Sequence, residues 1–167
     1  MFARLEISPQ RHDISAMPRL SVDSPLGRLT LRDEDGRLTA IDWRGKHAAA
    51  DETPLLLEAK RQLDAYFRGE LRAFDLPLQP AGPALEQQVW RLMSAIPYGE
   101  TRSYGELARA LGAEARDIGL ACGRNPLPIV VPCHRVMAAE GRLGGYSGGR
   151  GVETKLKLLT LEGALLV

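Results

Sequence analysis

Residues 103–122 read SYGELARALGAEARDIGLAC, and this stretch predicts two short helices joined by a tight turn. Ser103 and Glu106 form the capping-box pattern that begins a helix. Gly112 is the residue type that ends one, and the second helix runs from Glu114 to about Cys122. Two helices of this length, joined this closely, have the dimensions of a helix-turn-helix, although a plain helical hairpin has the same pattern.

The sequence on both sides of this helix pair predicts a mostly α domain. Periodic apolar residues indicate further helices, and glycine-rich segments after a β-branched run indicate a wing. The predicted elements are helices at Leu85–Ala95 and Val152–Leu161, a strand at Ile129–Val131, a turn at Glu140-Gly141 and a glycine-rich segment at 144–149. We therefore expect a C-terminal winged helix-turn-helix domain.

The N-terminal half predicts a small α/β domain that acts as a scaffold. Arg28–Arg32 and Arg37–Trp43 alternate apolar and polar residues around a turn, which predicts a hairpin. Thr53 and Pro54 are typical of a helix start, and this helix ends at Gly69. Leu71–Leu78 predicts one more strand.

The domain boundaries follow from a proline- and glycine-rich linker. We expect an N-terminal domain at residues 1–78, a linker at 79–84 and a C-terminal domain at 85–167. Residues 1–18 are expected to be a flexible extension. His12 and His47 stand alone in the N-terminal domain with no cysteine nearby, so no metal site is predicted there.

The composition is that of a soluble globular protein. The chain has 167 residues, of which 44% are hydrophobic and 26% charged. No apolar run approaches the roughly 18 residues that span a bilayer. Two cysteines argue against a disulfide scaffold and fit a reducing compartment. We expect a cytoplasmic protein without a membrane partner.

The charge is small but unevenly distributed. Residues 1–80 hold 12 Lys/Arg and 13 Asp/Glu, a net −1, and residues 81–167 hold 10 and 8, a net +2. Proteins with a strong electrostatic attraction to nucleic acid are usually more basic. Every basic residue between Ser94 and Arg150 is nevertheless arginine, which forms forked contacts with phosphate. A phosphate-binding surface and an ordinary solvated surface both fit this pattern.

Residues 128–136, PIVVPCHRV, contain the candidate nucleophile, Cys133. An isolated buried cysteine is most often inert. A metal site could use Cys122, Cys133 and His134, but no paired C-x-x-C supports it. A cysteine hydrolase would need a histidine in contact with the sulfur.

His134 is poorly placed for such a direct contact if this segment is a strand. Adjacent side chains on a strand point to opposite faces, so His134 would reach Cys133 through a bridging water or a kink after Pro132. A third group would have to orient the imidazole, and Glu162 is one candidate among several carboxylates.

The segment Pro132–Val136 resembles the active-site signature of the alkylguanine-DNA alkyltransferases, which repair DNA by direct reversal. Other segments of that family recur in the same order. They are Ser24–Gly27, Val89-Trp90, Ile96–Thr101, Ser103–Ala108, Asn125-Pro126, Gly145–Gly149 and Glu162-Gly163. The resemblance spans about residues 19–167 and implies a ribonuclease-H-like N-terminal domain.

The resemblance implies a single-turnover reaction. A guanine alkylated on O6 flips out of duplex DNA, and its alkyl group moves to Cys133; O4-alkylthymine is an expected second substrate. A Cys133–water–His134–Glu162 chain would activate the thiol, and Tyr104 would give the leaving guanine its proton. Asn125 would hold the helix-turn-helix to the active-site loop. No cofactor is expected, because the substrate carries its own alkyl group, and neither a metal nor an obligate protein partner; the protein should act as a monomer.

The resemblance also assigns contacts with DNA and with the flipped base. Arg116 would fill the space that the base vacates, with its helix in the minor groove. The expected DNA-contacting residues are Ser103, Tyr104, Gly105, Arg116, Arg124 and Arg135. The expected base-pocket residues are Val136, Met137, Tyr146 and Ser147, of which Ser147 would help recognise the guanine.

The chain departs from the family pattern around Arg116. The turn Gly112–Ala115 is shorter than usual, and Asp117 stands where a small alanine is usual. A carboxylate turned toward phosphates would weaken the affinity for DNA. The alternative function is that of a non-transferring winged-helix DNA-binding protein, which recognises alkylated bases or regulates.

Overall fold

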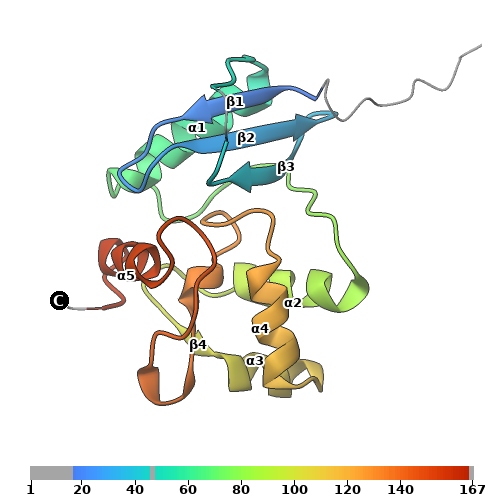
Figure 1. Ribbon diagram of the computed structural model, residues 1–167, viewed down its shortest axis with the longest axis vertical. Helices are drawn as coiled ribbons and strands as arrows, with labels where there is room; N and C mark the ends of the chain where they lie inside the picture. Colours follow the sequence, from blue (N-terminus) through green and yellow to red (C-terminus); the bar gives the residue numbers. More distant parts are fainter. Residues whose placement is uncertain (1–16, 46–47, 166–167) are drawn as a thin grey trace, which may run out of the picture.

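The computed structural model describes residues 17–45 and 48–165, which form two domains, one above the other in Figure 1. A three-stranded sheet and one helix make up the upper domain, and four helices make up most of the lower one. Most of the predicted N-terminal extension, together with His12 and His47, lies outside the described residues. Within the described ranges, no helix is both long enough and apolar enough to cross a membrane.

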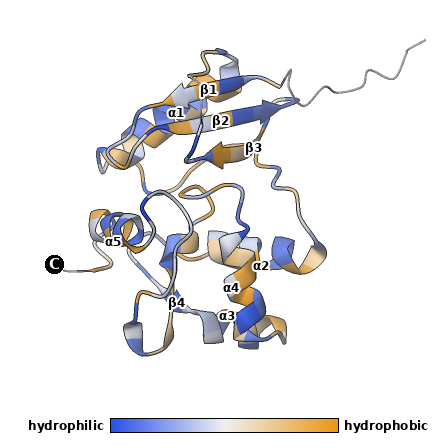
Figure 2. Ribbon diagram, viewed as in Figure 1, coloured by the Kyte–Doolittle hydropathy of each residue, from blue (hydrophilic) through white to orange (hydrophobic). Residues whose placement is uncertain are grey.

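The N-terminal sheet consists of three antiparallel strands. They are β1 (Arg19–Val22), β2 (Leu29–Glu34) and β3 (Arg37–Asp42), in the order β1-β2-β3. Burial alternates along β2, and Figure 2 shows hydrophobic and hydrophilic residues alternating in the sheet. Asp35 and Gly36, with φ of 51° and 79°, make the tight turn between β2 and β3. The predicted hairpin is confirmed, whereas β1 was not predicted.

Helix α1 (Pro54–Phe67) covers one face of this sheet. The Thr53 hydroxyl accepts a hydrogen bond from the Leu56 N–H at 3.2 Å, so the predicted N-cap is confirmed. Leu56, Leu63 and Tyr66 are buried at helical spacing against the strands. This packing holds Tyr66 at the end of α1 that faces the lower domain.

The predicted strand at Leu71–Leu78 is wrong. Only Leu78 forms a β-bridge, with Leu38, through hydrogen bonds of 2.8 and 2.9 Å. Pro77 has no N–H to donate, so the ladder cannot extend along this segment. The chain instead runs as an extended connection into the second domain (Figure 1).

The four helices of the C-terminal domain agree with the sequence prediction to within about a residue at each end. They are α2 (Ala84–Ser94), α3 (Tyr104–Leu111), α4 (Ala115–Gly123) and α5 (Val152–Leu161). The capping box is present: the Glu106 N–H donates to the Ser103 hydroxyl at 3.0 Å, and the Ser103 N–H donates to the Glu106 carboxylate at 2.7 Å. Gly112 ends α3 at a φ of 61°, so α4 packs directly against α3.

The predicted strand at Ile129–Val131 is also wrong. The Val130 N–H bonds to the Pro128 carbonyl at 2.9 Å across Ile129, whose φ is 74°, and the Cys133 N–H bonds to the Val131 carbonyl at 2.9 Å across Pro132. These are two γ-turns, and a β-branched residue at positive φ is strained. They bend the apolar run and deliver Cys133 to a short 3₁₀ turn.

This 3₁₀ turn, η2 (Cys133–Arg135), leads into a two-residue strand, β5 (Val136–Met137). β5 pairs in parallel with β4 (Arg102–Ser103), the residues that precede α3. The nucleophile candidate is therefore fixed to the start of the helix-turn-helix pattern. A second 3₁₀ turn, η3 (Ala139–Gly141), confirms the predicted turn at Glu140-Gly141.

Candidate active site

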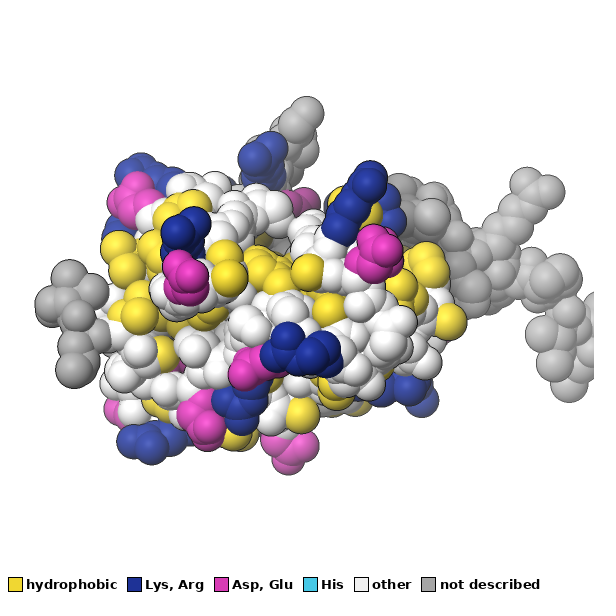
Figure 3. Space-filling model, turned by 90° about the horizontal axis from the view of Figure 1, so that it is seen from below, with side chains coloured by type: hydrophobic (Ala, Val, Ile, Leu, Met, Phe, Trp, Pro, Cys, Tyr) yellow, Lys and Arg dark blue, Asp and Glu magenta, His cyan; other side chains and the backbone are white. Residues whose placement is uncertain are grey.

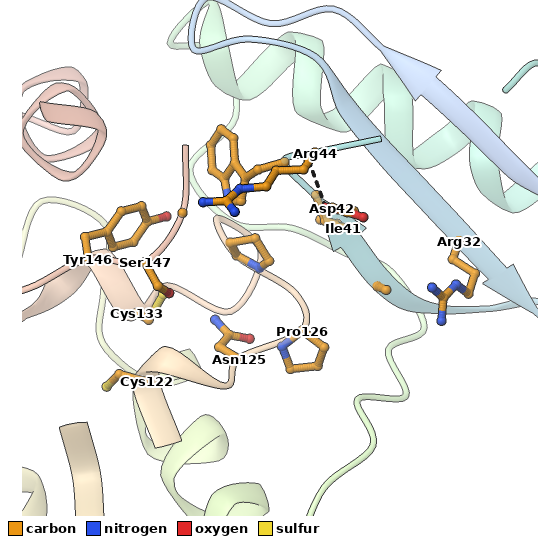
Figure 4. A pocket seen from close by; sticks show the side chains of 14 residues that line it. Arg32, Ile41, Asp42, Arg44, Cys122, Asn125, Pro126, Cys133, Tyr146 and Ser147 are labelled. Atoms are coloured by element: carbon orange, nitrogen blue, oxygen red, sulfur yellow. Dashed lines mark hydrogen bonds between the residues drawn. The ribbon is translucent and has the colours of Figure 1, made fainter. Parts of the chain in front are cut away.

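Cys133 lies at the junction of two cavities and is 7% exposed. The helix-side cavity, of about 460 Å³, lies next to α3 and α4. The interdomain cavity, of about 310 Å³, lies between β3 and the C-terminal domain (Figure 4). Four residues line both cavities: Cys122, Cys133, Tyr146 and Ser147. The thiol can therefore be reached from the side that carries the helix pair.

The imidazole of His134 and the carboxylate of Glu162 form a buried pair. His134 Nε2 lies 2.7 Å from Glu162 Oε2, and both side chains are fully buried. Arg135 also binds the carboxylate, through Nε to Oε1 at 2.7 Å and through Nη2 to Oε2 at 3.0 Å. The Tyr66 hydroxyl, from the N-terminal domain, donates to Oε2 at 2.6 Å. Spacing alone left Glu162 as one candidate among several carboxylates, the family resemblance selected it, and the structure places it on His134.

These contacts fix the protonation of the pair. Burial raises the pKa of the Glu162 carboxyl, but hydrogen bonds from His134, Arg135 and Tyr66 outweigh it and hold the pKa at about 2. The ionised carboxylate can only accept, so His134 Nε2 carries the proton. Burial lowers the pKa of His134, which keeps the imidazole neutral. Its Nδ1 is buried and has no hydrogen-bond partner among the described residues, so it is the free base of the site.

Cys133 needs such a base. Burial raises the pKa of its thiol, while the Asn125 side chain, the Lys155 ammonium and the Tyr146 hydroxyl oppose that rise. A thiol that remains protonated is a poor nucleophile. The site therefore holds a latent nucleophile and a neutral base, which suits chemistry that begins when a substrate is bound.

Lys155 is a functional candidate that the sequence interpretation missed. It is fully buried on α5, and its Nζ donates to the Val136 carbonyl at 2.6 Å. Burial lowers its pKa, but the two cysteines raise it. A signal was present in the sequence, because Lys155 shares the core-facing side of the helix with Leu158 and Leu159 at i+3 and i+4.

Asn125 connects the end of α4 to the active-site loop. Its amide donates to the Val131 carbonyl at 2.8 Å, and its carbonyl accepts from the Leu127 N–H at 3.0 Å. The two bonds hold the γ-turns that precede Cys133. A movement of α4 would therefore be transmitted to the thiol.

Three further predicted residues surround the mouth of the site. Tyr104 lines the helix-side cavity, and burial raises the pKa of its phenol to about 12, so it stays protonated and can donate. The buried Tyr146 hydroxyl has no hydrogen-bond partner within the part of the chain that the structure describes, and burial, together with the Cys133 thiol, raises its pKa. Figure 4 shows Tyr146 and Ser147 beside Cys133, whereas Arg32 lies at the far end of the interdomain cavity.

The predicted DNA-contacting residues differ in whether the structure exposes or buries them. Arg116 is exposed in the first turn of α4, and Ser103 and Gly105 lie at the start of α3. Arg124 is largely exposed and forms an ion pair of 2.9 Å with Glu86. The prediction that Arg135 contacts DNA is wrong. Its guanidinium is buried and bound to Glu162 and to the Ile96 carbonyl, where no phosphate can reach it.

Two of the predicted base-pocket residues also lie elsewhere. Val136 and Met137 are buried in β5, and neither lines the cavities that contain Cys133. The strand that carries them pairs in parallel with β4. They are therefore interior residues and form no part of either cavity wall.

The surface seen in Figure 3, from below the molecule, has apolar side chains around a central hollow. Basic and acidic side chains are interspersed over the rest of this face. This mixture agrees with the small net charge of +1. Among residues 17–45 and 48–165, no group of three or more His, Cys, Asp or Glu side chains could hold a metal ion.

Two family models match the chain. One, described as the ribonuclease-like domain of 6-O-methylguanine DNA methyltransferase, matches residues 19–80. The other, described as the DNA binding domain of 6-O-methylguanine DNA methyltransferase, matches residues 84–164.

Relatives and solved structures agree with these matches. A methylated-DNA–protein-cysteine methyltransferase from Mycolicibacterium paratuberculosis is 47% identical over 150 residues, which is 85% of this chain and 90% of that protein. A constitutive one from Bacillus subtilis is 42% identical over 154 residues, 85% of this chain and 93% of that protein. The crystal structure of Mycobacterium tuberculosis OGT in complex with DNA has a TM-score of 0.78 and 44% identity, and the match covers 87% of this chain and 92% of that one.

Proposed function

The chain belongs to the 6-O-methylguanine DNA methyltransferase family, and we propose that it repairs DNA by moving an alkyl group from O6 of guanine to Cys133. One observation carries this proposal. A buried thiol is followed directly in the chain by a neutral histidine whose Nε2 is bound to Glu162 and whose Nδ1 has no partner among the described residues. This arrangement holds the nucleophile unreactive until a substrate arrives.

The reaction can be written from these residues. The thiol proton of Cys133 passes through a bridging water to His134 Nδ1. Glu162 stabilises the resulting imidazolium. The sulfur attacks the alkyl carbon, so an S–C bond forms while the C–O6 bond breaks. The leaving guanine takes one proton from the Tyr104 hydroxyl, and the His134 imidazolium gives up the former thiol proton to solvent while the Tyr104 phenolate takes one back, so that both side chains end neutral. The product is an unmodified guanine and a thioether on Cys133; because thioethers resist hydrolysis, each molecule reacts once.

The helix pair α3–α4 is the part that binds duplex DNA in this proposal. It acts as a winged helix-turn-helix, and the N-terminal domain is a ribonuclease-H-like scaffold. Arg116 is supported as the residue that enters the duplex, because it is exposed in the first turn of α4, the helix whose later residues Gly119 and Cys122 line the helix-side cavity. We further propose that the protein binds duplex DNA containing alkylated bases as a monomer. Its N-terminal domain would end at residue 78 and its C-terminal domain would begin at residue 85, with a linker at 79–84.

The most direct test on the DNA side is recovery of the repaired base. A duplex with one O6-methylguanine is incubated with increasing amounts of protein, and its nucleosides are quantified. We expect one methylated guanine to be restored per molecule of protein, and none by Cys133→Ala. Cys122→Ala, which removes the other buried thiol, is the matched control for loss of a cysteine.

Two outcomes contradict the proposal. Binding of the methylated duplex without any loss of O6-methylguanine would favour a non-transferring DNA-binding protein. Restoration of many bases per protein molecule would exclude a stoichiometric transfer to Cys133.

A further inference from the structure

Tyr66 links the N-terminal domain to the catalytic pair, although the sequence gave it no role. Its hydroxyl donates to Glu162 Oε2 at 2.6 Å across a sequence separation of 96 residues. The same oxygen accepts from His134 Nε2 at 2.7 Å. Tyr66, His134 and Glu162 are all buried, with exposures of 0, 0 and 5%. Water therefore does not compete for these contacts.

Tyr66 could either orient the Glu162 carboxylate or change the charge on its oxygen, and the contacts of Arg135 show which of the two applies. The guanidinium holds both carboxylate oxygens, at 2.7 and 3.0 Å, so Glu162 keeps its orientation without the tyrosine. What Tyr66 adds is a hydroxyl dipole whose positive end faces the oxygen that carries the proton of His134. Such a donor lowers the negative charge that Oε2 presents to the imidazole and so makes the protonated imidazole less stable.

We propose that Tyr66 is a positioning residue of the transfer reaction, which acts through Glu162 to set the basicity of His134, so that the N-terminal domain takes part in activating Cys133. This inference rests on the proposed function. The direction is defined: with Tyr66 present His134 is a weaker base and stays neutral to lower pH, and without its hydroxyl His134 becomes protonated at higher pH.

Other charged and titratable groups face this pair from every element packed against it. Arg135 lies on η2, Lys155 on α5 and Tyr98 after α2, and Cys133 precedes His134 in the chain. Tyr98 provides a matched control. Its ring packs on that of Tyr66, with centroids 6.3 Å apart, but its hydroxyl donates to the Leu161 carbonyl at 3.2 Å and not to Glu162.

The test is the pH profile of alkyl transfer for the full chain and its Tyr66→Phe and Tyr98→Phe variants. The rate constant for single-turnover transfer from an O6-methylguanine duplex falls on acidification, when His134 becomes protonated. We expect Tyr66→Phe to move this acidic limb to higher pH by about 0.5 unit or more, the scale set by loss of one hydrogen bond to a carboxylate. Tyr98→Phe should leave the limb unchanged.

A second variant should shift the acidic limb of the pH profile in the opposite direction, and it retains the buried hydroxyl. Site-specific 3-fluorotyrosine at position 66 is almost the same size as tyrosine and a stronger donor, so the acidic limb should move to lower pH. It keeps the inference testable if Tyr66→Phe does not fold.

The outcomes are distinguishable. Superimposable profiles for the parent and the fluorotyrosine protein, or equal shifts in Tyr66→Phe and Tyr98→Phe, would overturn the role of Tyr66 while leaving transfer to Cys133 intact. Absence of transfer in the parent protein itself would overturn the proposed function, and this inference with it.

Discussion

Glu162 is the residue on which the buried site depends most. Its carboxylate accepts from His134, Arg135 and Tyr66, and these contacts join η2, the end of α5 and the N-terminal domain. Breaking a buried ion pair from one side leaves an uncompensated charge, which costs more than the pair contributes. Arg135 would be that charge here. Glu162 therefore holds both the reactivity of the site and part of the stability of the fold.

Glu162→Gln tests this double role. We expect a loss of about 3–5 kcal/mol in the free energy of unfolding, because the Arg135 guanidinium stays buried without its counter-charge. Transfer should also slow, since an amide cannot stabilise the imidazolium of His134. Denaturant unfolding measures the first effect. Glu153→Gln, on the exposed side of α5 in an ion pair with Lys157, is the control and should change stability by less than about 1 kcal/mol.

Lys155 affects the thiol by charge alone in this account. The Lys155 ammonium holds the pKa of Cys133 below the value that burial alone would give it, so Lys155→Met should raise that pKa. The pH at which Cys133 reacts half-maximally with iodoacetamide, followed on its own peptide, should then move upward. Lys157→Met, two residues along on the exposed face, should not move it. A downward or absent shift in Lys155→Met would contradict the assignment.

At the scale of the elements, residues with a strong local signal were predicted well. Ser103, Gly112, Thr53 and Pro54 fixed the starts and ends of helices, because caps act over one turn of chain. The strand predicted at Ile129–Val131 is wrong because its β-branched residues are bent by γ-turns that depend on a side-chain contact from Asn125, which lies just beyond the end of α4. Local propensity does not report such a contact.

The active site was predicted only where its residues carry a signal along the chain. Cys133 and His134 are adjacent in the chain, and Glu162 was a candidate from its place after the last helix. Tyr66 and the buried position of Arg135 depend on how two domains pack, which no spacing along one chain reveals. The expectation that Arg135 contacts DNA came from the family resemblance, which does not describe how the Arg135 side chain is buried in this chain.

The charges on helix α4 should affect the affinity of the protein for DNA. Asp117 is half-buried in its first turn, next to the exposed Arg116, so its carboxylate adds negative charge where the helix would approach phosphates. Asp117→Ala should bind undamaged duplex more tightly, with a steeper dependence of affinity on salt. Fluorescence anisotropy over a salt series measures both. Asp64→Ala, on α1, should match the parent protein; equal affinities for Asp117→Ala and the parent would refute the effect.

At the scale of the whole molecule, the N-terminal domain is more than a support. The Ile41 N–H bonds to the Pro126 carbonyl at 2.9 Å, next to Asn125, and Trp43 packs against Gly148 in the loop that closes the site. Together with Tyr66, these contacts place α1, β3 and the residue just after β3 against the reactive loops of the C-terminal domain. The two domains share one hydrophobic core, so a change in either should affect the thiol.

Gly148→Ala tests the contact with Trp43. A methyl group at this position would overlap Trp43 Nε1, so the ring or the loop has to move. We expect a loss of about 1–3 kcal/mol in the free energy of unfolding, as for other overpacked sites. Combining it with Trp43→Leu should recover part of that loss, a coupling that a double-mutant cycle measures. Gly145→Ala, in the same loop with open space around it, is the stability control.

In the proposed reaction, Cys133 itself accepts the alkyl group, and it does so once. Mass spectrometry of the protein after incubation with a duplex that contains O6-methylguanine tests this directly. We predict that one methyl group is added per molecule, on the peptide that contains Cys133, while the peptide that contains Cys122 keeps its mass. A protein that consumes O6-methylguanine without gaining mass, or that carries the methyl group on another residue, would contradict the account.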